Sequence, residues 1–143
     1  MVTRYLLLAV LTAALQGELD RKPQAQNCDA ASVDAVCKEL ANNGLAARVM
    51  IDCSHANSQK QHDRQVAVAR DIGAQVAAGD SRIFGVMIES HINPGRQDLV
   101  PGRPLEYGVS ITDACIGWDA TVETLRVLAD YLAARGCPPK DVG

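Results

Sequence analysis

Two short segments each lead from a run of apolar residues into a group of polar side chains. Residues 49–57 read VMIDCSHAN, and residues 86–91 read VMIESH. Each segment places an acid, a serine and a histidine after the apolar run, and the first also carries a cysteine. Carboxylate, thiol and imidazole groups hold metal ions and transfer protons, so both segments are candidates for one chemical site.

An imidazole and two carboxylates form the candidate ligand set. His55 and Glu89 come from the two segments, and Asp113 lies in the region that follows the second. Divalent ions such as manganese, iron or zinc accept this combination. The residues alone leave open an alternative in which His55 and Glu89 only form hydrogen bonds that shape loop starts. Spacing also cannot exclude three rival ligands, which are Asp52, Cys53 and His91.

The composition is typical of a single soluble globular domain. The 143-residue chain is 48% hydrophobic and 22% charged. Its formal net charge of -3 argues against a nucleic-acid partner, because such proteins contact phosphates through a basic face. With only 3% aromatic residues, the core must be aliphatic and rich in alanine. Such a core suits helices packed closely against a parallel sheet, and we therefore expect an α/β fold.

The cysteines and the first residues bear on the cellular compartment. Five cysteines without a CxxC pair indicate neither a zinc ribbon nor a disulfide framework, so we expect reduced thiols in a cytoplasmic protein. Residues 4–15, RYLLLAVLTAAL, have the charge-then-apolar form of a signal peptide, but a poor cleavage site follows. The run is also too short to cross a bilayer as a helix. We expect a buried strand or helix here and no membrane partner, with export as the alternative.

Apolar spacing and capping residues predict three helices. The first follows a cap at Asp29 and ends at residues 42–44, which read NNG. The second covers residues 60–78 and ends at Gly79, and the third ends before Gly136. The residues expected on the apolar faces or as caps are Val33, Val36, Cys37 and Leu40 for the first helix, Asn57, Ser58, Val68, Ile72 and Val76 for the second, and Asp119 or Thr121, Val122, Leu125, Leu128 and Leu132 for the third.

Two strands are expected between these helices, over residues 45–53 and 83–89. The unbroken apolar run at residues 49–51 is typical of a sheet covered on both faces. Residues 91–110 contain three prolines and three glycines without a period, which indicates a loop of functional length. Strands that alternate with helices predict right-handed crossovers and a parallel sheet. The carboxyl ends of both strands, with their polar residues, should then meet at one edge.

Two or three strands are too few to close a barrel, and a parallel sheet this narrow would leave both of its edges and much of its apolar face uncovered. We therefore expect the chain to be part of a larger unit.

Three motifs in series resemble the last third of type I 3-deoxy-D-arabino-heptulosonate 7-phosphate (DAHP) synthases. They are MIDCSHANS at residues 50–58 with Lys60 nearby, GVMIESH at residues 85–91, and YGVSITDACIGW at residues 107–118. Their order and intervening lengths are similar as well. The resemblance begins at about Asn27 and runs to Gly136, whereas residues 1–26 do not match.

The resemblance implies that residues 27–143 are the C-terminal part of a (β/α)8 TIM barrel, comprising about the last two βα units and a preceding helix. It also implies the condensation of phosphoenolpyruvate with erythrose 4-phosphate to DAHP and phosphate, the first step of the shikimate pathway to aromatic amino acids. The full-length family is expected to form homo-oligomers.

The family holds a divalent metal, which could be manganese, iron, zinc or cobalt, through a Cys, a His, a Glu and an Asp. By motif the last three fall on His55, Glu89 and Asp113. The resemblance further implies that His55 and Asp113 are catalytic and contact substrate. His55 would face phosphoenolpyruvate, and Asp113 would touch a hydroxyl of the erythrose.

Structural roles are expected for four neighbours of these motifs. We expect Lys60 at a helix start, Trp118 packed behind the site and Cys115 as a small buried hydrophobe. Cys53 is not the metal ligand of the family, because that cysteine lies near the beginning of the barrel.

The chain also departs from the family pattern. The metal-binding cysteine and most of the arginines and lysines that neutralise the substrates have no counterpart motif here, and Arg21 is followed by Lys22 and Pro23 in place of two glycines. Two phosphorylated anions need several fixed cations. We therefore expect this chain alone to be inactive or nearly so. The alternative is a non-catalytic metal-binding or subunit-interaction fragment of the synthase.

Overall fold

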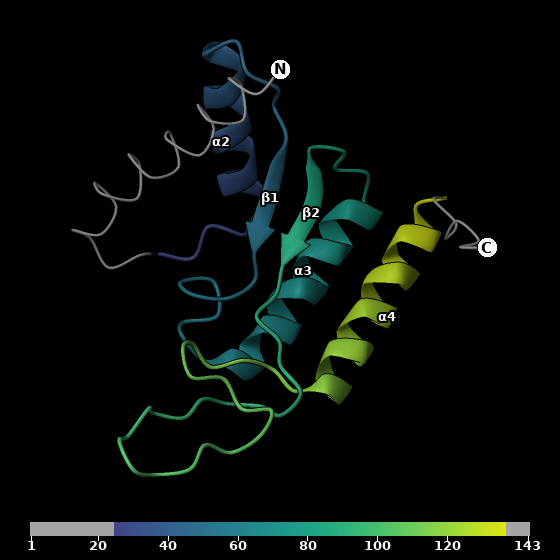
Figure 1. The fold of residues 1–143 in the computed structure, drawn as a ribbon. Coiled ribbons are helices and arrows are strands. Elements are labelled where there is room, and N and C mark those ends of the chain that lie inside the picture. The colour runs from purple at the N-terminus through teal and green to yellow at the C-terminus, as the bar shows by residue number, and fades with distance from the viewer. Residues whose placement is uncertain (1–24, 137–143) are drawn as a thin grey trace, which may run out of the picture.

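The computed structural model describes residues 25–136 (Figure 1). These residues form an α/β arrangement of three α-helices, one short 3-10 helix and two strands. In chain order the elements are α2 (Ala30–Asn42), β1 (Val49–Asp52), η1 (His62–Arg64), α3 (Gln65–Ala77), β2 (Ile83–Met87) and α4 (Trp118–Ala134). The apolar run at residues 4–15, expected to form a buried strand or helix, and Arg21, Lys22 and Pro23 lie outside the described residues.

Strands β1 and β2 pair in parallel, as predicted. Val49 lies opposite Ile83 and Asp52 opposite Met87, and an irregularity after Val49 leaves Phe84 without a partner. Both strands are shorter than predicted. Pairing begins only at Val49, because residues 46–48 form a tight turn, and it ends at Met87, whose carbonyl accepts a hydrogen bond from the Cys53 N–H at 2.9 Å. The carboxyl ends of both strands meet at one edge of the sheet (Figure 1).

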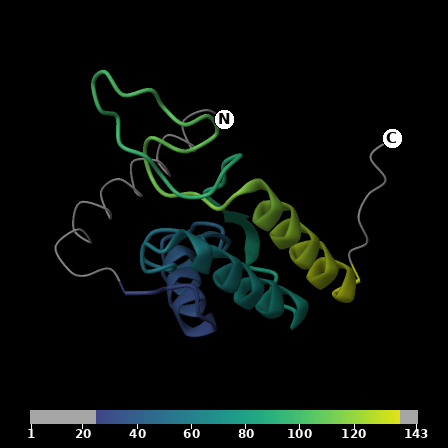
Figure 2. The same ribbon diagram turned by 90° about the horizontal axis from the view of Figure 1, so that it is seen from below.

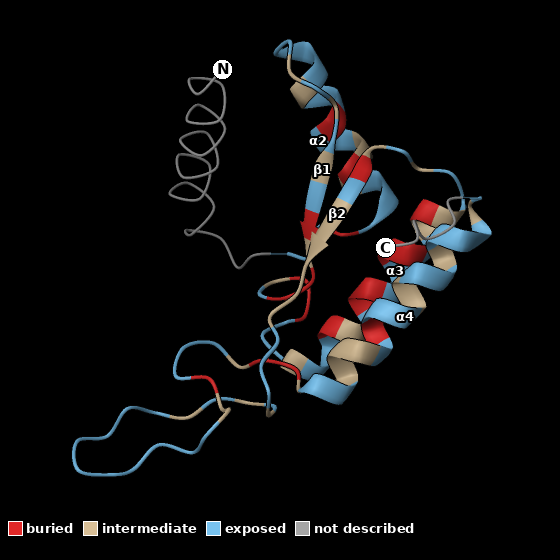
Figure 3. Cartoon of the chain, turned by 45° about the vertical axis from the view of Figure 1, so that its right-hand side comes forward, coloured by how far each residue is buried: buried red, intermediate tan, exposed pale blue. Residues whose placement is uncertain are grey.

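The core lies between one face of this sheet and the helices (Figure 3). It contains buried side chains from α2, the two strands, α3 and the segments next to them, namely Cys28, Val33, Cys37, Ile51, Cys53, Val68, Ala69, Ile72, Val76 and Ile83. The expected apolar line of α3 is therefore confirmed. In α2, Val33 and Cys37 are buried as expected, but Val36 is 45% exposed.

The apolar run at residues 49–51 indicates a sheet covered on both faces, but residues 25–136 cover only one, as expected for a sheet of so few strands. Ile51 is buried, but its neighbour Met50 is 56% exposed. Successive side chains of a strand point to opposite faces, so the Ile51 face meets the helices and the Met50 face does not. One face of the sheet is thus left uncovered by residues 25–136.

Helix α2 begins and ends as the sequence predicts. The Asp29 carboxylate accepts a hydrogen bond from the Ser32 N–H at 3.0 Å, which satisfies one free donor of the first turn. At the other end, Gly44 has a φ of +71°, the left-handed conformation that glycine adopts without strain.

The start of α3 differs from the prediction. Asn57 and Ser58 do not cap a helix at residue 60, since α3 begins at Gln65 after the short helix η1. Asn57 is buried and instead bonds the Asn27 side chain and the Asp52 carbonyl, at 3.0 and 2.8 Å. These bonds to distant residues hold it inside the fold and away from a helix terminus.

Helix α4 also begins differently. Gly117 occupies the capping position without a side-chain bond, so neither Asp119 nor Thr121 is the cap. The Thr121 hydroxyl donates to the Gly117 carbonyl at 2.8 Å, one turn back in the helix. Of the expected apolar face, Leu125 and Leu132 are 56% and 44% exposed.

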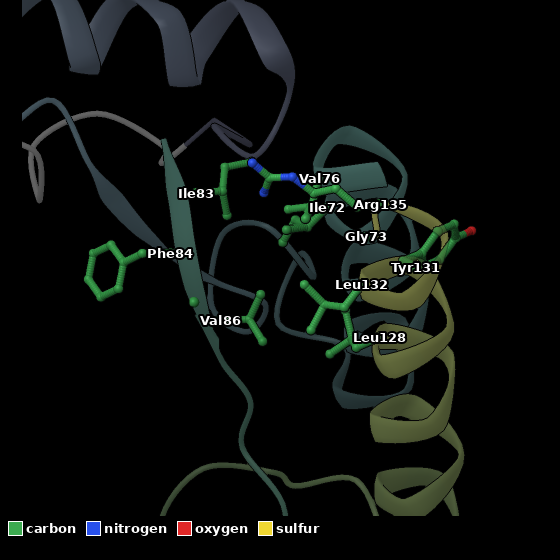
Figure 4. Close-up of a pocket in the computed structure, with 11 residues that line it drawn as sticks. Ile72, Gly73, Val76, Ile83, Phe84, Val86, Leu128, Tyr131, Leu132 and Arg135 are labelled. Carbon is green, nitrogen blue, oxygen red and sulfur yellow. The ribbon is translucent and has the colours of Figure 1, made fainter. Parts of the chain in front are cut away.

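Helices α3 and α4 lie side by side (Figure 2), and a glycine allows their close approach. A Cβ atom added at Gly73 would come within 2.3 Å of Cδ2 of Tyr131. An apolar groove remains between α3, α4 and β2, lined in part by Val86, Leu128 and Leu132, while Phe84 points away from it (Figure 4).

None of the helices within residues 25–136 combines the length and the hydrophobicity that crossing a bilayer requires. The four cysteines in this range, Cys28, Cys37, Cys53 and Cys115, are free thiols.

Candidate metal centre

The edge at which both strands end carries the candidate ligands. His55 follows the last residue of β1 by three positions, and Glu89 follows the last residue of β2 by two. Because Asp52 and Met87 are paired, these two side chains leave the sheet from neighbouring points. The sequence prediction that polar residues of both segments meet at one edge is therefore confirmed in its geometry.

Asp113 reaches the same place from the long loop. This loop returns to the strand end through a bridge between Ser90 and Ile116, in which the Ile116 N–H bonds the Glu89 carbonyl at 3.0 Å. The His91 N–H bonds the Ile116 carbonyl at 2.9 Å. Asp113 lies three residues before Ile116 and is exposed. The loop predicted over residues 91–110 continues to the start of α4 at Trp118, and this continuation carries the third candidate to the site.

The three candidate side chains converge. One ligand atom from each of His55, Glu89 and Asp113 lies within 4.8 Å of the other two. Bonds of about 2.0–2.2 Å from nitrogen or oxygen to a transition-metal ion give separations of up to about 4.4 Å between ligands. Small side-chain adjustments would therefore let one ion contact all three groups. Their role as ligands stays a prediction.

Asp52 determines which nitrogen of His55 faces the cluster. The Nδ1 atom of His55 lies 2.6 Å from Oδ2 of Asp52, and its Nε2 atom lies 3.6 Å from Oε1 of Glu89. A carboxylate beside Nδ1 favours the tautomer with hydrogen on Nδ1 and a free lone pair on Nε2. His55 has a φ of +47°, so this orientation is held at the cost of a strained backbone.

Ser54 fixes the carboxylate of Glu89. Its hydroxyl donates to Oε2 of Glu89 at 2.6 Å, and its backbone N–H donates to Oδ1 of Asp52 at 2.7 Å. Ser54 is only 5% exposed. With Oε2 occupied in this way, the other oxygen of Glu89 is the one directed at His55.

The site carries an excess of negative charge. The hydrogen bond to Asp52 raises the pKa of His55, and the charges of Asp52, Glu89 and Asp113 act in the same direction, while burial opposes them. Three carboxylates around one imidazole favour a bound cation, whether it is a proton on the ring or a metal ion. The electrostatics therefore suit a divalent metal.

The rival ligands have other surroundings. Asp52 contacts the far side of the imidazole ring, and His91 has its Nδ1 beside the Gly108 carbonyl. Burial raises the pKa of the Cys53 thiol to about 12, which disfavours the thiolate that a metal would need. Among the described residues, the ligand atoms that meet are those of His55, Glu89 and Asp113.

Two expectations about neighbouring residues are wrong and one is confirmed. Lys60 does not start a helix, because it closes a turn with a φ of +58° and its N–H bonds the His55 carbonyl at 2.8 Å. Trp118 is not packed behind the site, since it opens α4 at the surface with 64% exposure. Cys115 is buried, as expected.

Sequence reasoning missed the roles of Asp52 and Ser54. The spacing of the two residues is a usable signal, because an aspartate often accepts a hydrogen bond from the N–H two positions later. The bond from Ser54 to Glu89 joins residues 35 positions apart, and no local pattern indicates it.

Comparisons with known proteins find relatives of this chain. A sequence model of the DAHP synthetase I family matches residues 21–126. The phospho-2-dehydro-3-deoxyheptonate aldolase of Haemophilus influenzae is 49% identical over 109 residues, and the tyrosine-inhibited enzyme of that name from Schizosaccharomyces pombe is 54% identical over 114. Each alignment covers 76% of this chain and 30% of the relative.

A solved structure is similar as well. The phospho-2-dehydro-3-deoxyheptonate aldolase of Francisella tularensis superimposes with a TM-score of 0.73 at 41% sequence identity, over 78% of this chain and 32% of that one. The chain thus spans about a third of the length of the relatives that it matches.

Proposed function

This chain belongs to the DAHP synthetase I family, and we propose that it supplies three ligands of a divalent-metal centre for the condensation of phosphoenolpyruvate with erythrose 4-phosphate. The convergence of His55, Glu89 and Asp113 within 4.8 Å supports this proposal most directly. The resemblance of all three motifs to the family provides the reaction.

The ligand set fits a divalent cation in charge and in chemistry. Two carboxylates and one neutral imidazole suit manganese, iron, zinc or cobalt. Asp52 completes the arrangement by holding the second ring nitrogen of His55, the contact that metal-binding histidines usually make. A bound cation would supply Lewis-acid polarisation of the aldehyde oxygen of erythrose 4-phosphate.

The side chains of this chain would hold and orient the reactants. In the proposed reaction C3 of phosphoenolpyruvate bonds to the aldehyde carbon, water adds at C2, phosphate leaves from C2, and the aldehyde oxygen gains a proton. His55 would lie on the phosphoenolpyruvate side. Asp113 is exposed, so its carboxylate could accept a hydrogen bond from a hydroxyl of erythrose 4-phosphate.

We also propose that the two βα units belong to a (β/α)8 barrel formed by residues 27–143 together with further strands. The parallel pair β1 and β2, the helices on one face and the uncovered Met50 face support this placement. In such a barrel the uncovered face would point inward and pack against other strands. Free cysteines support a cytoplasmic location, and a homo-oligomer stays a prediction.

A chimeric enzyme tests the proposed function. Residues 27–136 would replace the matching third of the Phe-sensitive phospho-2-dehydro-3-deoxyheptonate aldolase of Escherichia coli, which is 51% identical over 109 residues. We expect metal-dependent release of phosphate from phosphoenolpyruvate when erythrose 4-phosphate is present. His55→Ala, Glu89→Ala and Asp113→Ala should each abolish it.

His91→Ala is the matched control, because it removes a nearby imidazole whose Nδ1 contacts the Gly108 carbonyl. This variant should retain activity. Full activity of the Glu89→Ala chimera would refute the ligand assignment. The relatives named above all carry enzyme names, so the comparisons do not favour the non-catalytic alternative.

A further inference from the structure

We propose that Gln65 is a positioning residue for the metal centre. This proposal rests on the proposed function of His55, Glu89 and Asp113. Gln65 is the first residue of α3, and its side chain is fully buried. Its amide group binds the backbone of Glu89 at two points. The N–H of Glu89 donates to Oε1 of Gln65 at 2.8 Å, and Nε2 of Gln65 donates to the carbonyl of Glu89 at 3.1 Å.

This double contact replaces a missing strand neighbour. Pairing between β1 and β2 ends where the Cys53 N–H bonds the Met87 carbonyl, so Glu89 lies beyond the last rung of the sheet. A residue there would leave its N–H and carbonyl without partners from β1, which is costly in a buried setting. The primary amide of glutamine carries one acceptor and one donor side by side, so it can satisfy both groups of one residue.

The contact also connects three parts of the site. The Glu89 carbonyl accepts a second bond, from the Ile116 N–H at 3.0 Å, on the segment that carries Asp113. The Glu89 side chain is held by Ser54 at 2.6 Å. A shift of the Glu89 backbone would therefore disturb its own carboxylate and the approach of Asp113 together. Gln65 contacts none of the reacting groups and acts through the position of Glu89.

Titration of the full chain with Mn²⁺ tests this role. Gln65→Met keeps an unbranched side chain of similar length but removes both hydrogen bonds. Loss of a residue that orients a metal ligand typically weakens metal binding about 10–100-fold, and we expect a loss in that range. Gln65→Glu has the same shape and keeps only the acceptor. Its added negative charge alone would tighten cation binding. We nevertheless expect weaker binding, and the lost hydrogen-bond donor would then be the cause.

Gln75→Met is the matched control. Gln75 lies on the same helix and donates to the Cys28 carbonyl at 2.8 Å, away from the ligands. This variant should lose comparable stability but keep its Mn²⁺ affinity within about twofold of the unaltered chain, since it leaves the ligand geometry in place. Affinities are compared at equal folded fractions, measured by circular dichroism.

A second readout reports ligand geometry. With saturating Co²⁺, the visible absorption bands should change in Gln65→Met and stay unchanged in Gln75→Met. If the unaltered chain binds Mn²⁺ and both Gln65 variants bind it equally well, the role of Gln65 is overturned and the metal centre stands. If the unaltered chain binds no Mn²⁺, the metal centre fails and the role of Gln65 fails with it.

Discussion

Substitution of Asp52 by asparagine tests whether the orientation of His55 depends on one carboxylate. Asp52 accepts from the Ser54 N–H through Oδ1 and contacts Nδ1 of His55 through Oδ2, at 2.7 and 2.6 Å. Asparagine has one oxygen and one NH₂ group. If its oxygen faces Ser54, the NH₂ group faces Nδ1 and drives the ring to the tautomer with hydrogen on Nε2. If the amide group is turned the other way, its NH₂ group faces the Ser54 N–H, and two donors meet without an acceptor.

Either arrangement of Asp52→Asn damages the metal centre. We expect Mn²⁺ affinity to fall about 10–100-fold, or about 1.4–2.7 kcal/mol of binding free energy. Isothermal titration of the full chain measures this. Asp63→Asn, in the exposed helix η1, removes the same charge without contacting the ligands. Unchanged affinity in Asp52→Asn would refute the orienting role, and an equal loss in Asp63→Asn would show that net charge alone determines binding.

Protonation of His55 should also weaken Mn²⁺ binding as the pH falls through its raised pKa, because the proton and the metal compete for the ring; binding that is constant from pH 8 to pH 5 would contradict this. Gly73→Ala should lower the free energy of unfolding by about 1–3 kcal/mol in urea titrations, since the new methyl overlaps the Tyr131 ring. In a chain that also carries Tyr131→Ala, the Gly73→Ala substitution should cost little. If the two losses of unfolding free energy simply added, the contact between these residues would be refuted. Arg82 lowers the pKa of Asp80 through a hydrogen bond, so the pair stabilises the fold above the unfolded pKa of Asp80 and loses this effect as the pH falls through the lowered value. In Arg82→Leu the melting temperature should therefore fall less steeply as the pH is lowered. An unchanged slope would show that this ion pair does not cause the acid dependence.

Elements that depend on neighbouring residues could be predicted from the sequence. The cap at Asp29, the apolar line of α3 and the glycine at the end of α2 follow from helical spacing and turn chemistry. The parallel pairing followed from alternation of strands and helices. The starts of α3 and α4 could not be predicted in this way, because Asn57 is held by Asn27, thirty residues earlier, and Gly117 caps α4 without a side chain.

The residues of the candidate site also differ in how far the sequence alone could predict them. Residue type and position after a strand made His55 and Glu89 candidates, since a parallel sheet brings the ends of its strands together whatever the intervening sequence. The choice of these two over the rivals Asp52, Cys53 and His91 came from the resemblance of the motifs to the family. Ser54 and Gln65, which both contact Glu89, act across 35 and 24 positions, and serine and glutamine occur too widely in proteins to be singled out. Sequence can thus indicate candidate ligands by their chemistry and motif, while the hydrogen bonds that support them need the fold.

The rigidity of the candidate site comes from polar contacts other than the hydrogen bonds of the sheet. His55 and Glu89 lie beyond the last paired residues of β1 and β2, so sheet hydrogen bonds do not hold them directly. His55 is held instead by Asp52, the last residue of β1, and Glu89 by Gln65, the first residue of α3. Asp113 has its carboxylate exposed on a loop that is joined to Glu89 through Ile116. The site should therefore keep the spacing of His55 and Glu89 when the loop is perturbed, and Asp113 should be the first of the three candidate ligands to move away.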